Sequence, residues 1–461
     1  MNFPASTNRV KRLQSGWRFA FYFVIACLFY YSLKALYHLI TPSTHSQKTQ
    51  QQQQKPNRYK QQNILFHHPD QDTTFHDFPW YQSQHTRPQF KPNASLLTTE
   101  LSAREREIMQ QKAILTAKRL AFKRFVPDDY KGIRGSKLTT PEEVQAFRDT
   151  LDCWTQGQWV HLSPKQLKKS FHLKHIQDPI YSTCDRRFYK THSENDTREA
   201  VSYQWQPVEY NSKHQACPSL NPKVEPKKWC KVLQGRNMLL VGDLVHYQFH
   251  EVLLDAFRDQ PTVCFGELNC KDHTICKSKD TRLRYVRNDI LSTIRKFQNR
   301  DQGHPLANIV EWPFVTSNVL SSYPILILNR APLLGDDDLL FTRRLIHTMK
   351  VIRDTSPDAL VIYRSSFVGH PFCDDATQPL TQPLTDEELK RLPYGWSETK
   401  RRNAIAKAVI EAAGGVYIDF ASMIDLRPDG HLGGQDCLRY CIPGPLDATV
   451  QVLYNVFTRL L

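Results

Sequence analysis

Residues 235–246 read GRNMLLVGDLVH: an apolar run, a Gly-Asp pair and the start of an amphipathic pattern. Asn237 to Val241 has no polar alternation, which is typical of a strand buried on both faces of a sheet. A helix is expected from near His246. Its apolar residues fall on one face: Phe249, Val252, Leu253, Ala256 and Phe257. A buried strand that passes through a tight turn into a helix is the repeating unit of parallel α/β sheets.

The same unit recurs further along the chain. Strands are expected at Tyr323–Leu328, Ala359–Tyr363 and Val416–Phe420, and helices over 339–353 and 401–413. The fold class is therefore predicted to be α/β, a three-layer α/β/α sandwich around a mainly parallel sheet. Ligands bind beyond the carboxyl ends of such strands. The residues expected at that edge are Gly242, Asp243, Asn329 and the segment after Phe420.

The N-terminal region contains an apolar segment, FAFYFVIACLFYYSL at 19–33, which can continue to Ile40. At about 1.5 Å per residue it can cross a hydrocarbon core of roughly 30 Å. Basic residues precede it, so its N-terminus is expected to stay cytosolic. A cleaved signal peptide is the alternative, but no small-residue cleavage site follows. We predict a cytosolic tail at 1–18 and a transmembrane signal anchor at 19–40, which makes a single-pass type II membrane protein.

Residues 41–98 are polar and Gln-rich and predict a disordered stem. Residues 99–149 predict a helical stem and lead-in, and 150–461 the lumenal domain. Within 99–124, four apolar residues fall seven apart: Leu101, Ile108, Leu115 and Phe122. Because no second apolar position recurs in each heptad, a packing helix is favoured over a coiled coil. Sequons at Asn93 and Asn195 predict N-glycosylation in a lumenal domain.

Ten of the eleven cysteines lie beyond the apolar segment, and an even number there favours disulfides in an oxidising compartment. They are Cys153, Cys184, Cys217, Cys230, Cys264, Cys270, Cys276, Cys373, Cys437 and Cys441, with pairing left open. A zinc site at Cys264, Cys270, His273 and Cys276 is disfavoured because its spacing is unusual for zinc. We therefore predict no metal. The net charge of +15 suits an acidic partner such as an anionic glycan, and no basic run suggests nucleic acid.

Several stretches resemble the trichome-birefringence-like or PC-esterase family, relatives of the SGNH/GDSL-type hydrolases. They are Cys153-Trp154 with GQWV at 157–160, YQWQP at 203–207, GRNMLLVGDL at 235–244, ILN at 327–329 and DCLRYCIPGPLD at 436–447. The resemblance spans roughly 150–461, and the last block is its most specific part. It implies an SGNH-like fold and acyl transfer to, or removal from, a polysaccharide hydroxyl in the Golgi, without a cofactor.

The resemblance also implies a site. Family members use a Ser after Gly-Asp as nucleophile and an Asp and a His from the closing block. This chain retains Gly242, Asp243, Asn329 and Asp436, but Leu244 stands at the Ser position and Arg439 at the His position. Arginine stays protonated and cannot act as a base. The resemblance thus predicts a degenerate enzyme that binds a glycan, through Gly242, Asn329 and Arg439, or binds an active relative.

Simpler structural roles are predicted for the retained residues. Asp243 is expected to cap the following helix, and Asp436 to pair with Arg439 three residues later. For Asn329 both a role in the site and a role in pinning a turn stay open. A cationic pocket at Arg439, gripping a carboxylate or sulfate, is the functional alternative.

Two other enzymatic interpretations stay open. One is an active O-acetyltransferase with rearranged residues, in which His246, His431, Ser365 or Ser366 would supply the chemistry. The other is a metal-dependent glycosyltransferase, since Asp336-Asp337-Asp338 contains an Asp-x-Asp pattern. That triplet precedes an apolar helix, however, where acids also serve as caps.

Overall fold

The computed structural model describes residues 101–125, 132–173, 183–193, 195–210, 215–257, 272–277, 281–304, 307–331, 337–370, 373–389, 396–433 and 436–461. All of them belong to one compact unit, residues 62–461. The predicted tail, anchor and stem, with Asn93, lie outside the described residues. Among the helices described, none is long and apolar enough to cross a membrane.

A six-stranded sheet forms the centre of this unit, in the order β10-β9-β8-β3-β5-β4. The strands are β3 (Met238–Gly242), β4 (Asp272–Thr274), β5 (Arg282–Arg287), β8 (Ile325–Leu328), β9 (Leu360–Arg364) and β10 (Val416–Ile418). Five are parallel, and only β4 runs antiparallel to its neighbour β5. The predicted mainly parallel sheet is confirmed.

The order of the parallel strands locates a crevice. Numbered along the chain, the five strands lie in the doubly wound order 2-1-3-4-5, so the winding direction reverses between β3 and β8. Ligands of such sheets bind outside the carboxyl ends at the point of reversal. Gly242 ends β3, Asp243 follows it and Asn329 follows β8, so all three lie at that point.

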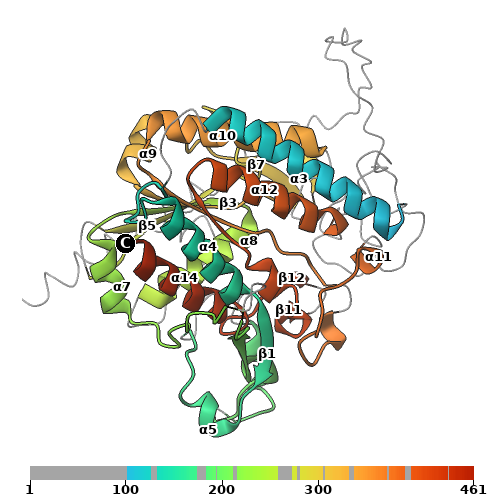
Figure 1. Cartoon of the computed structure of the whole chain (residues 1–461). Helices are drawn as coiled ribbons and strands as arrows, with labels where there is room; N and C mark the ends of the chain where they lie inside the picture. Colours follow the sequence, from blue (N-terminus) through green and yellow to red (C-terminus); the bar gives the residue numbers. More distant parts are fainter. Residues whose placement is uncertain are drawn as a thin grey trace, which may run out of the picture. The chain divides into compact units, whose positions relative to one another are not determined.

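Helices cover both faces of the sheet (Figure 1). One layer contains α4 (Pro141–Thr155), α7 (Pro226–Leu233), α8 (Leu244–Phe257) and α14 (Leu446–Leu460). The other contains α3 (Ala103–Phe125), α10 (Asp338–Thr355) and α12 (Thr399–Ala412). Alternate residues of the strands contribute to the two layers: Leu240 and Ile327 pack with the first, Val241 and Leu328 with the second. This alternation accounts for the unbroken apolar runs in the sequence.

Strand β5 was missed from the sequence because RLRYVR carries three arginines. It lies next to the edge strand β4, and its Arg282 is exposed while Leu283 and Tyr285 are buried. Such alternation is typical of a half-covered strand and gives a weaker signal than the continuous runs of β3 and β8.

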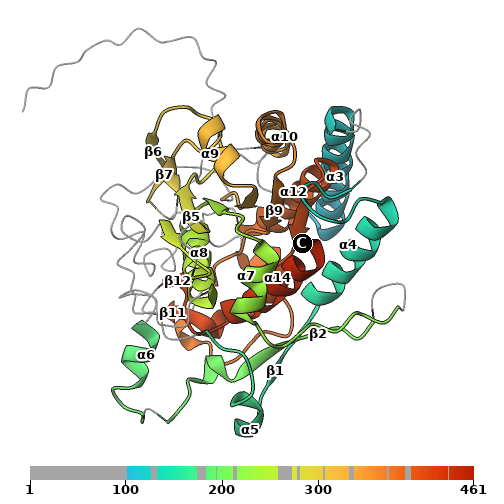
Figure 2. The ribbon, with the colours of Figure 1, turned by 90° about the vertical axis from the view of Figure 1, so that its left-hand side faces the viewer.

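The described residues also contain shorter elements. Three small antiparallel pairs are β1 (Gly157–His161) with β2 (Tyr203–Pro207), β6 (Gln298–His304) with β7 (Ala307–Glu311), and β11 (His431–Gly433) with β12 (Asp436–Tyr440). The short helices are α5 (Pro164–Leu167), α6 (Thr183–Phe188), α9 (Ser317–Ser322), α11 (Asp386–Leu389) and α13 (Ala421–Ile424). Figure 2 shows β1 and β2 projecting beside α4 and α14.

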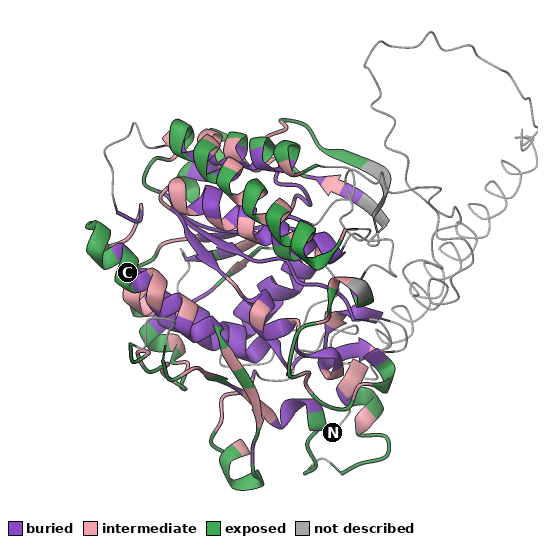
Figure 3. Ribbon diagram, turned by 45° about the vertical axis from the view of Figure 1, so that its right-hand side comes forward, coloured by how far each residue is buried: buried purple, intermediate pink, exposed green. Residues whose placement is uncertain are grey.

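Helix α3 packs on α12 and α10, which confirms a packing helix at this position. It does so through fully buried alanines, Ala117 and Ala121. The residues seven apart face away: Ile108, Leu115 and Phe122 are 55%, 66% and 62% exposed. Small residues allow close approach of two helices, and the larger apolar side chains of α3 are left exposed. Figure 3 shows how exposed and buried residues are distributed along the ribbon of the domain.

Four disulfides join the described cysteines: Cys153–Cys217, Cys184–Cys441, Cys230–Cys276 and Cys373–Cys437. Disulfides were favoured over zinc, and the pairing of Cys276 with Cys230 confirms this for Cys276. Cys264 and Cys270 lie outside the described residues. The Cys184–Cys441 and Cys373–Cys437 bridges tie α6 and the loop after β9 to the closing block.

Candidate functional site

Asp243 connects β3 to α8 and is buried. Its Oδ1 accepts a hydrogen bond from the backbone N–H of His246 at 2.9 Å, so it caps α8 as predicted. Gly242 permits this turn, because an added Cβ would lie 2.8 Å from the side chain of His246. The Gly-Asp pair therefore has a structural role that does not depend on a nucleophile.

Asn329 directly follows β8 and contacts Asp243. Since carboxylate oxygens only accept hydrogen bonds, the amide nitrogen of Asn329 faces Asp243, 3.2 Å from each oxygen. Its amide oxygen lies 3.0 Å from the Ser366 hydroxyl. The structure thus brings together two of the residues that the sequence placed at this edge, and both are buried.

Arg364 is the residue at this edge that sequence reasoning missed. It is the last residue of β9 and is fully buried. Its Nε donates to Nδ1 of His246 at 2.8 Å, and its Nη2 lies 3.6 Å from Oδ1 of Asp243. Burial lowers the pKa of its guanidinium to about 10, opposed by the charge of Asp243, so it stays protonated at neutral pH. The sequence feature that could have identified it is an arginine directly after the apolar run at 359–363.

His246 is held at both ring nitrogens. Since Nδ1 accepts from Arg364, Nε2 carries the proton and donates to the Ile327 carbonyl oxygen, 3.0 Å away. Burial, and then the charge of Arg364, lower the pKa of His246 well below its ordinary value. A general base needs a free nitrogen near its substrate. His246 therefore has no nitrogen available to replace the missing base.

Leu244 begins α8, half-buried and packed against the core on that side of the sheet. In the family that the sequence resembles, this position carries the nucleophile. At a helix N-terminus a hydroxyl would benefit from the positive end of the helix dipole. A leucine at this position instead contributes apolar packing.

Arg439 lies on β12 and is bound to Asp436. The Nε–Oδ2 and Nη2–Oδ2 distances are 2.7 and 2.6 Å, and Oδ1 of Asp436 accepts from the backbone N–H of Arg439 at 3.1 Å. This confirms the predicted pair three residues apart. The Arg439 side chain is 26% exposed and that of Asp436 is 11% exposed.

A side-chain clamp brings β12 to α8. Gln248 accepts a hydrogen bond from the backbone N–H of Tyr440 at 3.1 Å and donates one to the Tyr440 carbonyl. Residues four apart on a helix lie on the same face, so Leu244 lies one turn from the clamp on the side that faces β12. The structure therefore brings together α8, which Leu244 begins, and β12, which carries Arg439.

His431 and His370 form a buried pair beneath the closing block. Nδ1 of His370 and Nε2 of His431 are 2.7 Å apart. Their outer nitrogens face backbone carbonyls, those of Asp425 at 2.8 Å and Arg439 at 3.1 Å. Burial lowers the pKa of His370 to about 4, and burial and then His370 lower the pKa of His431 well below its ordinary value. His431 thus lies between His370 and the Arg439 carbonyl.

The two serines after β9 are also engaged in the fold. The Ser365 hydroxyl accepts from the backbone N–H of Ala421 at 2.7 Å, and the Ser366 hydroxyl lies 2.7 Å from the Arg330 carbonyl. The side chain of Ser365 also forms hydrogen bonds with those of Tyr417 and Asp419, and the side chain of Ser366 contacts Asn329. Neither serine is hydrogen bonded to a histidine in the contacts described. A relocated Ser-His pair gains no support from this arrangement.

Asp289 is a second buried acid at this edge, following β5, and it too escaped the sequence analysis. Burial raises its pKa to about 7, against the opposing charge of Arg287 at 3.0 Å. It also accepts from the backbone N–H of Val310 at 2.8 Å. Asp289 therefore ties β7 to the edge next to Asp243.

The Asp-x-Asp pattern serves α10. Asp337 caps the helix by accepting from the backbone N–H of Leu340 at 2.7 Å, and Asp338 pairs with Arg401 at 2.8 Å. Asp336 lies outside the described residues. The expectation that these acids act as a cap and first-turn acids is confirmed for Asp337 and Asp338.

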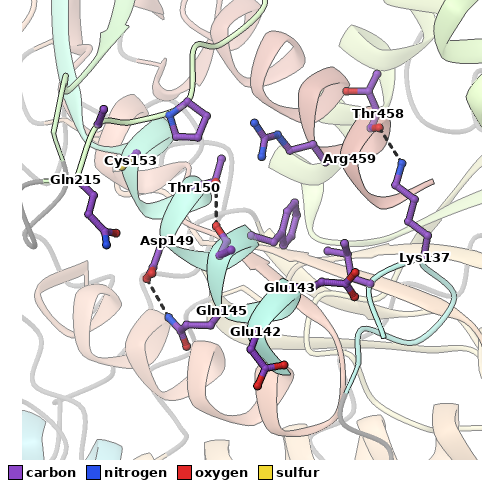
Figure 4. A pocket seen from close by; sticks show the side chains of 15 residues that line it. Lys137, Glu142, Glu143, Gln145, Asp149, Thr150, Cys153, Gln215, Thr458 and Arg459 are labelled. Carbon is purple, nitrogen blue, oxygen red and sulfur yellow. Dashed lines mark hydrogen bonds between the residues drawn. The ribbon is translucent and has the colours of Figure 1, made fainter. Parts of the chain in front are cut away.

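A cavity of about 840 Å³ lies away from this edge, between α4 and the end of α14 (Figure 4). Lys137 and Arg459 line it together with Glu142, Glu143 and Asp149. None of the residues at the sheet edge lines it. Its mixed charges point to no single class of ligand, and we assign it none.

Comparison with known proteins gives one distant relationship. No protein-family model matches the chain. Over 147 residues it is 22% identical to Protein trichome birefringence-like 23 of Arabidopsis thaliana, which covers 26% of this chain and 34% of that protein. The chain thus matches about a third of the length of this curated relative. It is distantly similar, over part of its length, to a trichome-birefringence-like protein.

Proposed function

We propose that this chain is an SGNH-like, Golgi-lumenal relative of glycan O-acyltransferases and esterases that has lost its Ser-His chemistry. It is anchored by residues 19–40 and binds a glycan, or an active relative, instead of turning over an ester. The distant similarity to a trichome-birefringence-like protein supports the family. The switch of winding direction next to Asp243 and Asn329 supports the location of the site.

One observation carries the loss of activity. The position that would hold the nucleophile is the apolar Leu244, and the position that would hold the base is Arg439, whose guanidinium is bound to Asp436. Without a nucleophile and a base, acyl transfer by the Ser-His route has no starting point. In a serine protease, loss of the nucleophile alone lowers turnover by about a millionfold.

The alternative of an active enzyme with rearranged residues needs a base elsewhere. In the described part of the chain, the histidines considered for this role, His246 and His431, have both ring nitrogens in hydrogen-bonding contacts. Asp243 and Asn329, which would support an oxyanion or a base, are engaged with each other and with Arg364. This network favours a fixed structural edge over a reactive site.

The test is an assay of the purified full chain for ester hydrolysis, for acyl transfer to glycans and for glycan binding. We expect no turnover. We also expect binding of acidic glycans that weakens in Arg439→Gln but not in Arg343→Gln, which changes an exposed residue of α10. Robust acyl transfer that survives changes at Asp243, Asn329 and Asp436 would overturn the proposal.

A further inference from the structure

Two aromatic side chains are exposed together on the β6–β7 hairpin. Phe297 and Trp312 are 48% and 43% exposed, and their ring centroids are 4.5 Å apart with an angle of 43° between the ring planes. They lie opposite each other, just beyond the paired residues Gln298 and Glu311 of β6 and β7. Exposed apolar side chains usually occur singly, so two aromatic rings in contact indicate a surface that binds a ligand.

Hydrogen bonds fix this aromatic pair to the carboxyl edge of the sheet. The backbone N–H of Trp312 donates to the Arg287 carbonyl at 2.9 Å, and the side-chain amide of Asn288 donates to the Trp312 carbonyl at 3.0 Å. The backbone N–H of Asn288 in turn donates to the Gly242 carbonyl at 3.0 Å. Trp312 is therefore linked through Asn288 to the end of β3, where the winding direction reverses and ligands of such sheets bind. Figure 2 shows β6 and β7 beside β5.

The hairpin is joined to the other side of this crevice as well. The backbone N–H of Asp289 donates to the Val310 carbonyl at 2.9 Å, and the Asp289 carbonyl accepts from the backbone N–H of Ala331 at 2.8 Å. Ala331 follows β8, shortly after Asn329. Because the segments after both flanking strands hold the hairpin, the fold itself sets the position of its aromatic pair beside the crevice.

The side chains next to Phe297 in the sequence are polar. Arg295, Lys296, Gln298 and Asn299 are all exposed, and each can donate hydrogen bonds. The face of an aromatic ring is electron-rich and attracts the C–H groups on one face of a sugar ring, while the hydroxyls at the sugar's rim need hydrogen-bond partners. A carboxylate on the sugar would pair with the two cations. Rings, amides and cations together therefore suit an acidic sugar better than a purely apolar ligand.

We propose that Phe297 and Trp312 form an aromatic subsite that stacks on an acidic sugar unit of the bound glycan. This inference rests on the proposed function, because it names a second contact of the same glycan. Stacking on the rings provides affinity that does not depend on charge. Arg295 and Lys296 provide the preference for a carboxylate, so the two contributions can be measured separately.

The test measures the affinity of the purified full chain for oligogalacturonate, which is acidic, and for its uncharged methyl ester. Trp312→Ala should weaken the binding of both about tenfold, whereas Lys296→Gln should weaken that of the acid alone, by about threefold. Trp312→Phe should retain most of the affinity and Trp312→Leu should not, because leucine is apolar but has no ring. Phe122→Ala removes an exposed ring from α3 and is the matched control, which should bind like the wild type.

Three outcomes would overturn the inference. One is equal affinity of Trp312→Ala and the wild type, and another is full affinity of Trp312→Leu, which would mean that apolar contact suffices without stacking. The third is dimerisation of the wild type that Trp312→Ala abolishes, since a second chain would then cover the rings. Binding that falls in Arg439→Gln but not in Trp312→Ala would contradict this inference alone. Absence of binding in the wild type would contradict the proposed function as well.

Discussion

Nε of Arg364 donates a hydrogen bond to Nδ1 of His246, 2.8 Å away and 118 residues apart in sequence. This bond fixes the tautomer of His246 and, with Asp243, joins the ends of β3 and β9. Asn329 adds the end of β8 to the same network. The carboxyl edge of the sheet is therefore closed by polar groups that satisfy one another, in the place where a catalytic site of this fold would open to substrate.

The first prediction concerns the stability that this network provides. Arg364→Met should lower the free energy of unfolding by about 3–5 kcal/mol, because it leaves Asp243 as a buried charge without its cation. Arg343→Met, at an exposed position of α10, should change it by less than about 0.5 kcal/mol. Denaturant unfolding of both variants measures the difference. An equal loss of unfolding free energy in the two variants would mean that the contacts of Arg364 with Asp243 and His246 do not stabilise the fold.

The second prediction concerns pH and the pair of His370 and His431. The pKa of His370 is about 4 in the fold, below its ordinary value, so the unfolded chain binds the proton first. The stabilisation from the neutral ring is present above about pH 6.5 and is lost as the pH falls toward 4. The slope should approach about 1.4 kcal/mol per pH unit in this window.

Replacement of the ring separates this effect from other groups that titrate. His370→Gln should be less stable than the wild type at pH 8, because hydrogen bonds to Asp425 and His431 are lost. The difference between the two proteins should shrink as the pH falls from 6.5 to 4. Unfolding measured across this range checks the trend, and a constant difference would contradict it.

The sequence predicted what depends on local pattern. Four parallel strands, the helices after three of them and the cap at Asp243 follow from apolar runs and turn residues that are contiguous in the chain. Arg364 and Asp289 were missed because their roles depend on partners that only the folded sheet brings together: His246 for one, and Val310 for the other. The outward face of α3 was missed because a spacing of seven does not reveal which side of the helix packs on the domain. In the structure, Ala117 and Ala121 form the packed side.

The third prediction concerns the cysteines. Protein purified without reductant and then denatured should show no reactive thiol from the eight cysteines of the four described disulfides. Breaking Cys373–Cys437 by Cys373→Ala with Cys437→Ala should cost about 4 kcal/mol, since the bridge closes a segment of 64 residues. Thiol titration and metal analysis are the measurements. Bound zinc with most cysteines reactive would contradict the oxidising compartment.

The fourth prediction concerns topology. Asn195 lies in a turn and is exposed, as is Thr197, so the sequon is accessible to glycosylation. If the domain is lumenal, Asn195→Gln should remove one N-glycan and increase gel mobility, and endoglycosidase should reduce the difference. Asp196→Asn keeps the sequon intact and is the matched control. Absence of glycan at both Asn93 and Asn195 in expressed protein would argue against a lumenal domain.

The last prediction tests whether the two substituted positions account for the loss of chemistry. The wild-type chain should not react with serine-directed inhibitors, because Leu244 offers no hydroxyl. Leu244→Ser alone should remain unreactive, since Arg439 cannot accept a proton. Leu244→Ser with Arg439→His restores a hydroxyl directly after Asp243 and an imidazole beside Asp436, and here we expect weak covalent labelling.

The structure also supplies the control for that experiment. Gln248 clamps Tyr440, the residue after Arg439, to α8, the helix that Leu244 begins. Adding Gln248→Ala to the restored pair should therefore abolish the labelling while leaving Ser and His in place. Labelling that persists without the clamp, or that appears in Leu244→Ser alone, would mean that another group activates the serine and that Arg439 does not occupy the position of the base.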